Sequence, residues 1–243
     1  MSFDSDGTIQ LTKSKIDPEM THLLNELAKR YLVNVISGTT LEYLQPNVLD
    51  QMEPNPNVSV SPTCGTRFVA LKDGKYELIY EELLTDDQIK RITAAFEYAM
   101  EKAGHRPEKV WGEIIENRGT QVSFSAYGQK APAEVKLPYD PDLSKRKVIA
   151  GYLKEKISEK EFEIKIAGGS TIDVTRVGIH KGYGMRKLCE YYNITLDDIV
   201  FVGDRLDEIG NDYPVAEEGV DSIWVKDHEE TKKVIAELVK IKS

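Results

Sequence analysis

The chain begins with two aspartates, Asp4 and Asp6, directly before a Gly7-Thr8 turn. On an extended segment, residues two apart point to the same side, so we expect the two carboxylates to converge where the strand ends. Paired carboxylates repel one another unless a cation or a shared proton lies between them. The pattern indicates a hard divalent metal beside a carboxylate that acts as a nucleophile or as an acid/base. Taken alone, it is as typical of a surface Asp-Gly turn.

The composition limits the classes of function. The chain has 243 residues, a net charge of -9 and 40% hydrophobic residues, which predicts one large or two modest domains with real cores. The negative charge disfavours a nucleic-acid partner, which needs a basic surface. Cys64 and Cys189 lack metal-ligand spacing and are interpreted as isolated thiols of a reducing compartment. Without an apolar run of about 18 residues or a signal peptide, we expect a cytoplasmic protein without membrane contact.

The hydrophobic pattern predicts how the chain is organised. Both ends alternate short apolar runs with amphipathic segments, which favours a parallel sheet with crossover helices. The middle third instead predicts an antiparallel sheet with two helices, inserted into this α/β alternation. The expected strands are 31–36, 58–60, 67–71, 76–80, 114–116, 121–126, 161–166, 171–174, 199–202 and 222–225. The first helix is expected to start at Pro18. The other expected helices cover 40–52, 86–102, 143–157, 182–192 and 229–241.

The first strand is expected to be unusually short. Only three residues precede Asp4, whereas a strand typically has about 5–6 residues. Either the sheet accommodates a very short strand at this position, or the native chain starts further upstream.

Further polar residues follow the predicted strands or begin the predicted helices. These are Ser37, Lys181, Asp204 and the pair Asn211-Asp212. Ligands of open α/β sheets bind outside the carboxyl ends of the strands, so we expect these residues to share one site with Asp4 and Asp6. Singly, each has a plain structural alternative: Ser37 caps a helix, Lys181 is a solvated lysine, and the aspartates belong to turns. Their joint order along the chain outweighs these alternatives.

The residue types of this predicted site fit the chemistry of phosphoryl transfer. Asp4 is the candidate nucleophile and Asp6 the candidate general acid/base, with Ser37 and Lys181 holding the phosphoryl oxygens. Asp204 and Asp212, with the Asp4 and Asp6 pair, would hold a Mg²⁺ ion, whose charge offsets the repulsion between an anionic nucleophile and phosphate.

These motifs resemble those of a known family. Phe-Asp4-x-Asp6-Gly-Thr, Ser37-Gly38, Lys181 and Gly-Asp204-(x)6-Asn-Asp212 are similar, in order, to the four motifs of the haloacid dehalogenase (HAD) superfamily. The insertion resembles the C2B-type cap of subclass IIB. The resemblance implies a Rossmann-like HAD core over residues 1–82 and 178–243, an α+β cap over 83–177, and Gly38 as a substrate-binding residue beside Ser37.

Within the family, the chain resembles the phosphomannomutase-like branch most. Asn117-Arg118-Gly119, Gly168-Gly169 and Ile172-Asp173-Val174 are similar to cap segments of that branch, which implies that Arg118 and Asp173 bind substrate. Where that branch has further arginines, this chain has Lys13 and Gln129, and no counterpart to a third lies in 130–139. Lys130, Lys136 and Arg176 are the cations that remain as substitutes.

These departures decide between two enzymes. A mutase has to keep a bisphosphorylated intermediate, which favours several arginines on the non-reacting phosphate. The sequence therefore predicts a Mg²⁺-dependent phosphatase of a small phosphorylated metabolite, plausibly a sugar phosphate, in a monomer or a homodimer. A hexose-phosphate mutase is the alternative. A non-catalytic protein that binds phosphorylated ligands is a third reading, which the intact Asp4 and Lys181 disfavour.

Overall fold

The chain forms two compact units. The computed structural model describes residues 1–11, 14–136, 138–167 and 169–240. The core unit comprises Met1–Glu81 and Ile179–Ser243, and the cap unit is Glu82–Gly178. Glu82 and Gly178, which the sequence analysis assigned to the core, thus belong to the cap unit. Its two ends are joined, because Arg176 Nη2 donates a hydrogen bond to the Glu82 carbonyl oxygen at 3.0 Å.

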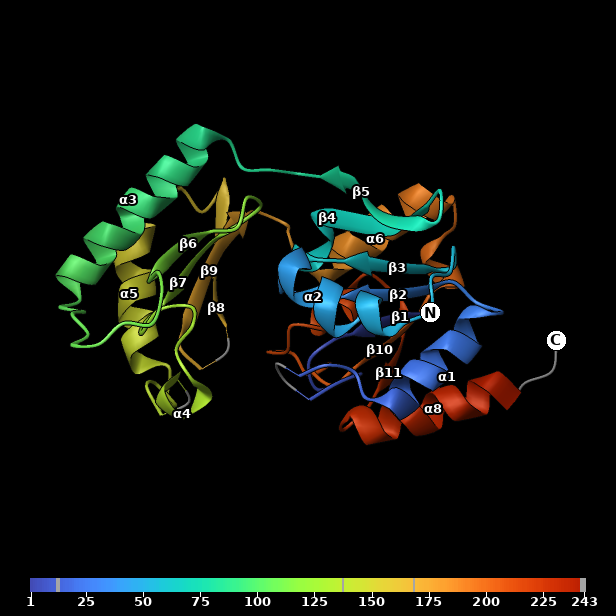
Figure 1. Cartoon of the computed structure of the whole chain (residues 1–243). Helices are drawn as coiled ribbons and strands as arrows, with labels where there is room; N and C mark the ends of the chain where they lie inside the picture. Colours follow the sequence, from blue (N-terminus) through green and yellow to red (C-terminus); the bar gives the residue numbers. More distant parts are fainter. Residues whose placement is uncertain (12–13, 137, 168, 241–243) are drawn as a thin grey trace. The chain divides into compact units, whose positions relative to one another are not determined.

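The core unit is built on one sheet. Its strands are β1 (Ser2–Asp4), β2 (Val33–Ile36), β3 (Val58–Ser61), β4 (Arg67–Lys72), β5 (Lys75–Glu81), β10 (Val200–Gly203) and β11 (Asp221–Trp224). They lie in the order β11-β10-β1-β2-β3-β4-β5 (Figure 1). The neighbours from β11 to β3 pair in parallel, and β4 and β5 add an antiparallel edge. The predicted α/β class is confirmed.

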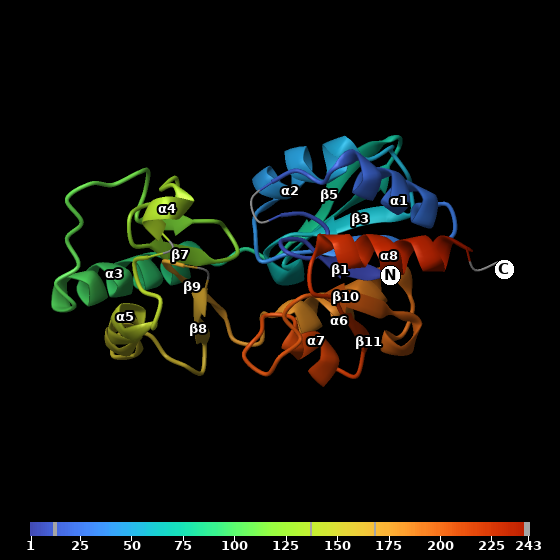
Figure 2. The same cartoon turned by 90° about the horizontal axis from the view of Figure 1, so that it is seen from below.

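Helices cover both faces of this sheet (Figure 2). They are α1 (Pro18–Ala28), α2 (Leu41–Asn47), α6 (Lys181–Tyr192), α7 (Tyr213–Glu217) and α8 (His228–Lys240). Leu24, Leu44 and Ile235 place α1, α2 and α8 on one apolar cluster. Met185 and Val215 place α6 and α7 on another, which includes Phe201 of β10. β1, only three residues long, lies in the middle of the sheet and is wholly buried.

Local signals explain where most of these elements begin and end. Asp17 caps α1 as predicted, because its side chain accepts a hydrogen bond from the Met20 amide at 2.9 Å, with Pro18 as the first helical residue. The helix expected to run to about Met52 ends at Asn47, and a separate 3₁₀ turn covers Leu49–Gln51. Pro46 lies within the last turn of α2, and the backbone leaves the helical conformation at Val48, with φ of -125° and ψ of -65°.

The cap unit is a sheet covered on one face by two helices (Figure 1). Its strands are β6 (Ile115–Asn117), β7 (Val122–Ser125), β8 (Phe162–Ala167) and β9 (Thr171–Arg176). They are antiparallel, in the order β6-β7-β9-β8. The helices are α3 (Asp86–Lys102) and α5 (Ser144–Lys154), and a short α4 (Ala133–Lys136) was not predicted in the proline-rich segment. Their apolar residues pack on Val122, Phe124, Ile172 and Val174.

The strand register places a polar row on the opposite face of the cap sheet. Glu116 pairs with Ser123, Ser123 with Asp173, and Asp173 with Lys165. Side chains of directly paired residues share one face, so these four residues cross the sheet side by side.

In the described residues, no helix is long and apolar enough to cross a membrane.

Candidate active site

The structure brings the core-unit candidates to one edge of the sheet. Asp4 is the last residue of β1, Ser37 directly follows β2, and Asp204 directly follows β10. Lys181 is the first residue of α6, and Asp212 directly precedes α7. The three strands are parallel neighbours, so their carboxyl ends meet. This is the edge at which open α/β sheets bind ligands.

Lys181 connects two carboxylates that are 177 and 31 residues away in sequence. Its ammonium donates hydrogen bonds to Asp4 Oδ1 and to Asp212 Oδ1. All three side chains are buried, with exposed fractions of 1%, 6% and 0%. The other Asp212 oxygen accepts a hydrogen bond from the Arg205 amide at 3.0 Å. The solvated-lysine alternative is therefore wrong, because a buried ammonium needs such partners.

Glycines allow this close packing. A Cβ at Gly203 would lie 2.5 Å from Asp212 Oδ2, and a Cβ at Gly182 would lie 2.4 Å from the Pro214 carbonyl oxygen. The first contact brings the end of β10 against Asp212. The second brings the start of α6 against α7, which places Lys181 beside Asp212. Side chains at either glycine would push the charged residues apart.

The electrostatics of the site leave it short of positive charge. Burial raises the pKa of Asp4 to about 7, although Lys181 acts in the opposite direction and Asp212 adds to the rise. Burial and then Asp212 raise the pKa of Asp204. Burial acts to lower the pKa of Lys181, but Asp4 and Asp212 outweigh it and raise that pKa. The site thus has one ammonium group, that of Lys181, for three neighbouring carboxylates, those of Asp4, Asp204 and Asp212.

A divalent cation fits this arrangement. Asp4, Asp204 and Asp212 each offer a carboxylate oxygen, and the three oxygens lie within 4.8 Å of one another. Oxygen-only ligands of this kind suit Mg²⁺. A cation would offset the burial of Asp4 and Asp204 and their repulsion from Asp212, which together raise the pKa values of these two carboxylates. Asp6, also expected among the ligands, is not in this group of carboxylates. Its Oδ1 instead accepts from Tyr43 and Gln10.

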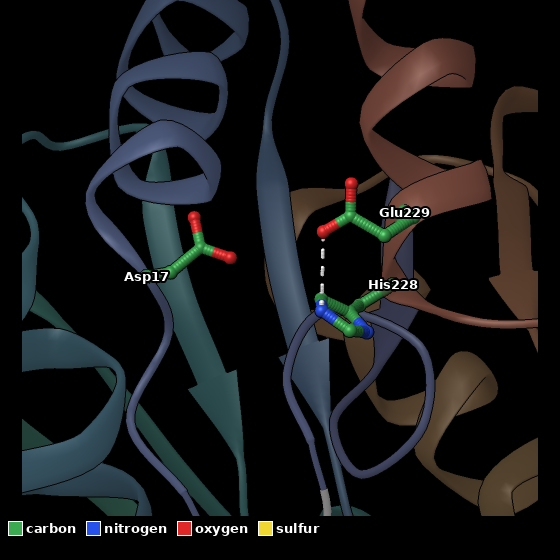
Figure 3. Close-up of side chains that lie close together, drawn as sticks. All are labelled: Asp17, His228 and Glu229. Carbon is green, nitrogen blue, oxygen red and sulfur yellow. Dashed lines mark ion pairs between the residues drawn. The ribbon is translucent and has the colours of Figure 1, made fainter.

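A second group of possible ligands lies where α1 and α8 begin. Asp17, His228 and Glu229 offer atoms within 4.8 Å of one another, and Figure 3 shows the Asp17 carboxylate facing the other two. The Lys232 ammonium, however, already lies 2.9 Å from Asp17 Oδ2 and 2.7 Å from Glu229 Oε1. A cation is therefore in place, and this cluster is better explained as a contact between the two helices.

Ser37 and Gly38 form a turn beside the acidic cluster. The Ser37 hydroxyl is 2.9 Å from Thr39 Oγ1 and accepts a hydrogen bond from the Thr39 amide at 3.2 Å. The N-cap of α2 is Thr40, so the helix-capping alternative for Ser37 is wrong. The turn is fixed by the neighbouring loop, because the Cys64 amide donates to the Ser37 carbonyl oxygen at 2.8 Å.

Three residues at the site were not predicted from the sequence. The buried Thr8 hydroxyl lies 3.4 Å from Asp4 Oδ2 and 3.4 Å from Asp204 Oδ1, and so connects two of the carboxylates. Its place in the Asp6-Gly-Thr8 turn was the available signal. Tyr43 and Gln10 contact Asp6, and neither stands in a pattern that would have singled it out.

The cap-unit candidates lie together on the polar face of the cap sheet. Arg118 donates from Nε to Glu116 Oε2 at 2.5 Å and from Nη2 to Gln129 Oε1 at 2.9 Å. Asp173 accepts from Ser123 Oγ at 2.5 Å. Burial raises the pKa of Asp173, and Arg118 opposes this rise. Gln129 Nε2 donates to the Ser123 carbonyl oxygen at 3.4 Å, which connects Arg118 with Asp173 through Gln129 and Ser123.

Two of the remaining candidate cations, Arg176 and Lys136, have other partners. Arg176 bonds to Glu82, and Lys136 Nζ donates to the Gln129 carbonyl oxygen at 2.7 Å. Lys13 and Gly168, singled out in the sequence, lie outside the residues that the structure describes.

A cavity of about 420 Å³ in the cap unit is separate from these groups. Its lining includes His105, Tyr139 and Lys145, but none of the predicted site residues. His105 contacts the Ala126 carbonyl oxygen at 2.8 Å and the Tyr139 hydroxyl at 3.3 Å. Burial lowers the pKa of His105. A neutral ring with one donor and one acceptor satisfies both contacts, so His105 is explained as part of the wall.

Comparison with known proteins agrees with this geometry. Residues 1–237 match the family model of haloacid dehalogenase-like hydrolases. A phosphomannomutase of Spinacia oleracea is 29% identical over 97% of this chain and 94% of its own length. Phosphomannomutase 1 of Dictyostelium discoideum is 26% identical, again over 97% of this chain and 94% of its own length.

Solved structures share the fold. An N-terminally truncated Plasmodium falciparum IMP-nucleotidase matches with a TM-score of 0.67 and 16% identity, over 99% of this chain and 70% of that one. Trehalose-6-phosphate phosphatase of Aspergillus fumigatus matches with a TM-score of 0.58 and 17% identity, over 99% and 92%. At these identities the likeness concerns the fold alone. The match to the family model over nearly the whole chain shows that it belongs to the haloacid dehalogenase-like hydrolases.

Proposed function

We propose that the protein is a Mg²⁺-dependent phosphatase that hydrolyses a small phosphorylated metabolite, plausibly a sugar phosphate. The observation that carries the proposal is the buried Asp4 carboxylate, held by Lys181 beside Asp204 and Asp212 at the ligand-binding edge of the sheet. A binding protein has no need for a nucleophile that is held at such a cost in buried charge. This disfavours the non-catalytic alternative.

In the first step, an Asp4 oxygen attacks phosphorus. The bond between phosphorus and the leaving oxygen breaks, and its electron pair goes to that oxygen, which takes a proton from Asp6. The products are an aspartyl-phosphate and a free alcohol. Lys181 has three N–H donors, of which Asp4 and Asp212 use two, so one is left for a phosphoryl oxygen. Ser37 and Gly38 would bind the other oxygens.

In the second step, water attacks the phosphorus of the aspartyl-phosphate. Asp6, now a carboxylate, takes the proton of the water, and the Asp4 carboxylate leaves. Inorganic phosphate is released and Asp6 is again protonated. Asp4, Asp204 and Asp212 are the residues that would hold Mg²⁺, which when bound supplies positive charge that offsets the repulsion between phosphate and Asp4.

The cap unit favours a phosphatase over a mutase. The polar face of the cap sheet carries two positive charges, from Arg118 and Lys165, and two negative charges, from Glu116 and Asp173. It therefore has no excess of positive charge that could bind a second phosphate. Gln129, where a mutase-like chain would have an arginine, accepts from Arg118 and adds no charge. Such a face suits the hydroxyl groups of a neutral sugar, with Arg118 and Asp173 as binding residues.

A hexose-phosphate mutase is the second candidate, and the phosphomannomutase relatives at 26–29% identity favour it. We place the protein in the cytoplasm, as a monomer or a homodimer without a nucleic-acid partner. The net charge of -9 and the two cysteines, Cys64 and Cys189, which are not joined in a disulfide, support this proposal.

The test is a panel of phosphorylated metabolites with Mg²⁺, with released phosphate as the readout. We expect turnover of sugar phosphates, its loss on removal of Mg²⁺ by chelation, and its loss in Asp4→Asn. Asp221→Asn, at an exposed aspartate of β11, is the matched control and should retain activity. Mannose 1-phosphate is then assayed with and without a hexose bisphosphate. Isomer formation without phosphate release would instead establish the mutase.

A further inference from the structure

Asp6 is held by two side chains from different parts of the core unit. The Tyr43 hydroxyl, on α2, lies 3.3 Å from Asp6 Oδ1 and 3.4 Å from the Ser14 carbonyl oxygen. Gln10 Nε2 lies 3.5 Å from the same oxygen and 3.2 Å from the Tyr43 hydroxyl. Asp6 Oδ1, the Tyr43 hydroxyl and Gln10 Nε2 are therefore all within 3.5 Å of one another. None of these contacts involves Asp4, Asp204 or Asp212.

The backbone fixes this arrangement. Asp6 and Gln10 form a β-bridge, and the Gly7 amide donates to the Gln10 carbonyl oxygen at 2.8 Å. Gln10 is buried, and its Nε2 also donates to Ser5 Oγ at 2.8 Å. Its Oε1 has no hydrogen-bond partner among the described residues. The contacts of Nε2 thus set the orientation of this amide, and the amide in turn limits the rotation of Asp6.

We propose that Tyr43 and Gln10 are positioning residues that hold Asp6 in the orientation in which it protonates the leaving oxygen. This inference rests on the proposed function, in which Asp6 is the general acid. Both contacts are made with Oδ1, and they restrict the orientation of the whole carboxyl group.

The chemistry of the leaving group separates positioning from a structural role. An alkoxide is a poor leaving group and needs the proton of Asp6 as its bond to phosphorus breaks. A nitrophenolate is stable without that proton. A misplaced general acid therefore slows the reaction of alkyl phosphates selectively, whereas a loosened core slows all substrates alike.

The experiment measures kcat/KM of the Mg²⁺-loaded full chain for phosphate monoesters with leaving groups from nitrophenol to aliphatic alcohols. Tyr43→Phe keeps the ring and removes only the hydroxyl. For an alkyl phosphate we expect kcat/KM to fall about tenfold, as for loss of one hydrogen bond, and for p-nitrophenyl phosphate less than about twofold. Gln10→Met should show the same selectivity.

Two controls complete the test. Tyr76→Phe removes a hydroxyl that, among the described residues, accepts from the Asn55 amide at 3.4 Å and has no contact with Asp6. Tyr76 packs on the same apolar cluster as Tyr43, so this variant should leave the leaving-group dependence unchanged. In the Asp6→Asn background, Tyr43→Phe should have no further selective effect, because the acid that it positions is gone.

A uniform loss in Tyr43→Phe, no loss at all, or the same selectivity in Tyr76→Phe would overturn the positioning role. The proposed function fails separately, if the wild-type chain releases no phosphate or if Asp6→Asn does not itself become selective for good leaving groups. Either of these results would overturn the proposed function and, with it, the positioning role of Tyr43 and Gln10.

Discussion

At the scale of single residues, the charge balance of the site depends on Lys181. Its ammonium is the only cation that the described residues place in hydrogen-bond contact with both Asp4 and Asp212. Replacement with methionine leaves two buried carboxylates facing each other. We expect Lys181→Met to abolish turnover and to lower the free energy of unfolding by about 3–5 kcal/mol without Mg²⁺.

Urea unfolding with and without Mg²⁺ measures this effect. Added Mg²⁺ should restore part of the stability of Lys181→Met, because a cation between the carboxylates replaces part of the lost charge. Lys181→Arg, which keeps the charge, is the matched variant and should be destabilised less. A Lys181→Met protein as stable as the wild type would contradict the assigned charge balance.

The raised pKa of Asp4 predicts how stability depends on pH. Asp4 has a pKa of about 7 in the folded chain, against an ordinary value of 3.8. The folded state therefore binds this proton more tightly than the unfolded state does. Its contribution to stability is present below pH 3.8 and is lost as the pH rises to about 7.

Asp4→Asn isolates this contribution, because the amide does not titrate. Without Mg²⁺, the wild type should lose stability relative to Asp4→Asn as the pH rises from 5 to 7. Urea unfolding of both proteins at several pH values gives the difference. Parallel curves for the two proteins would show that Asp4 titrates normally.

At the scale of elements, a buried ion pair holds the start of α5. Arg146 donates from Nε to Asp140 Oδ2 at 2.9 Å, with side-chain exposures of 1% and 0%. Asp140 also accepts from the amides of Lys145 and Arg146, in the first turn of the helix. Burial acts to raise the pKa of Asp140, but the hydrogen bonds from Arg146 and Lys145 outweigh it and lower that pKa.

Arg146→Met should therefore destabilise the protein by about 3–5 kcal/mol, because Asp140 remains buried without its partner. Arg91→Met is the control within the same unit. It removes an ion pair with Glu161 whose side chains are 43% and 37% exposed, and it should cost at most about 1 kcal/mol. Denaturant unfolding and hydrogen exchange of the α5 amides are the measurements. Equal costs for the two variants would refute the role of the buried pair.

The elements also show what the sequence can and cannot predict. Asp17, Pro18 and the short apolar runs are local signals, and they placed the start of α1 correctly and the strands β2, β3, β10 and β11 to within one or two residues. α2 ends at Asn47 and not near Met52, and a separate 3₁₀ turn follows it, so the end of this helix was not predicted. The contact between Tyr43 and Asp6 joins residues 37 apart. It depends on how α2 packs, which no spacing in the sequence encodes.

At the scale of the whole molecule, the cap unit is one continuous segment with its own core. Its apolar cluster includes Phe96, Phe124, Leu153 and Phe162, and all of its buried members lie within residues 82–178. We expect this segment to fold cooperatively when produced alone. Near-ultraviolet circular dichroism and thermal unfolding test this, with Arg146→Met in the isolated segment as a destabilised comparison. A segment without a cooperative transition would show that the unit depends on the rest of the chain.

The central claim is that Asp4 becomes phosphorylated during turnover. Rapid acid quenching of the Mg²⁺-loaded protein with an accepted phosphorylated metabolite, followed by mass spectrometry of the peptide that contains Asp4, tests it most directly. The account predicts one phosphoryl group on Asp4, formed before phosphate release and absent from Asp4→Asn. Turnover by Asp4→Asn at the wild-type rate, or a phosphoryl group on another residue, would contradict it.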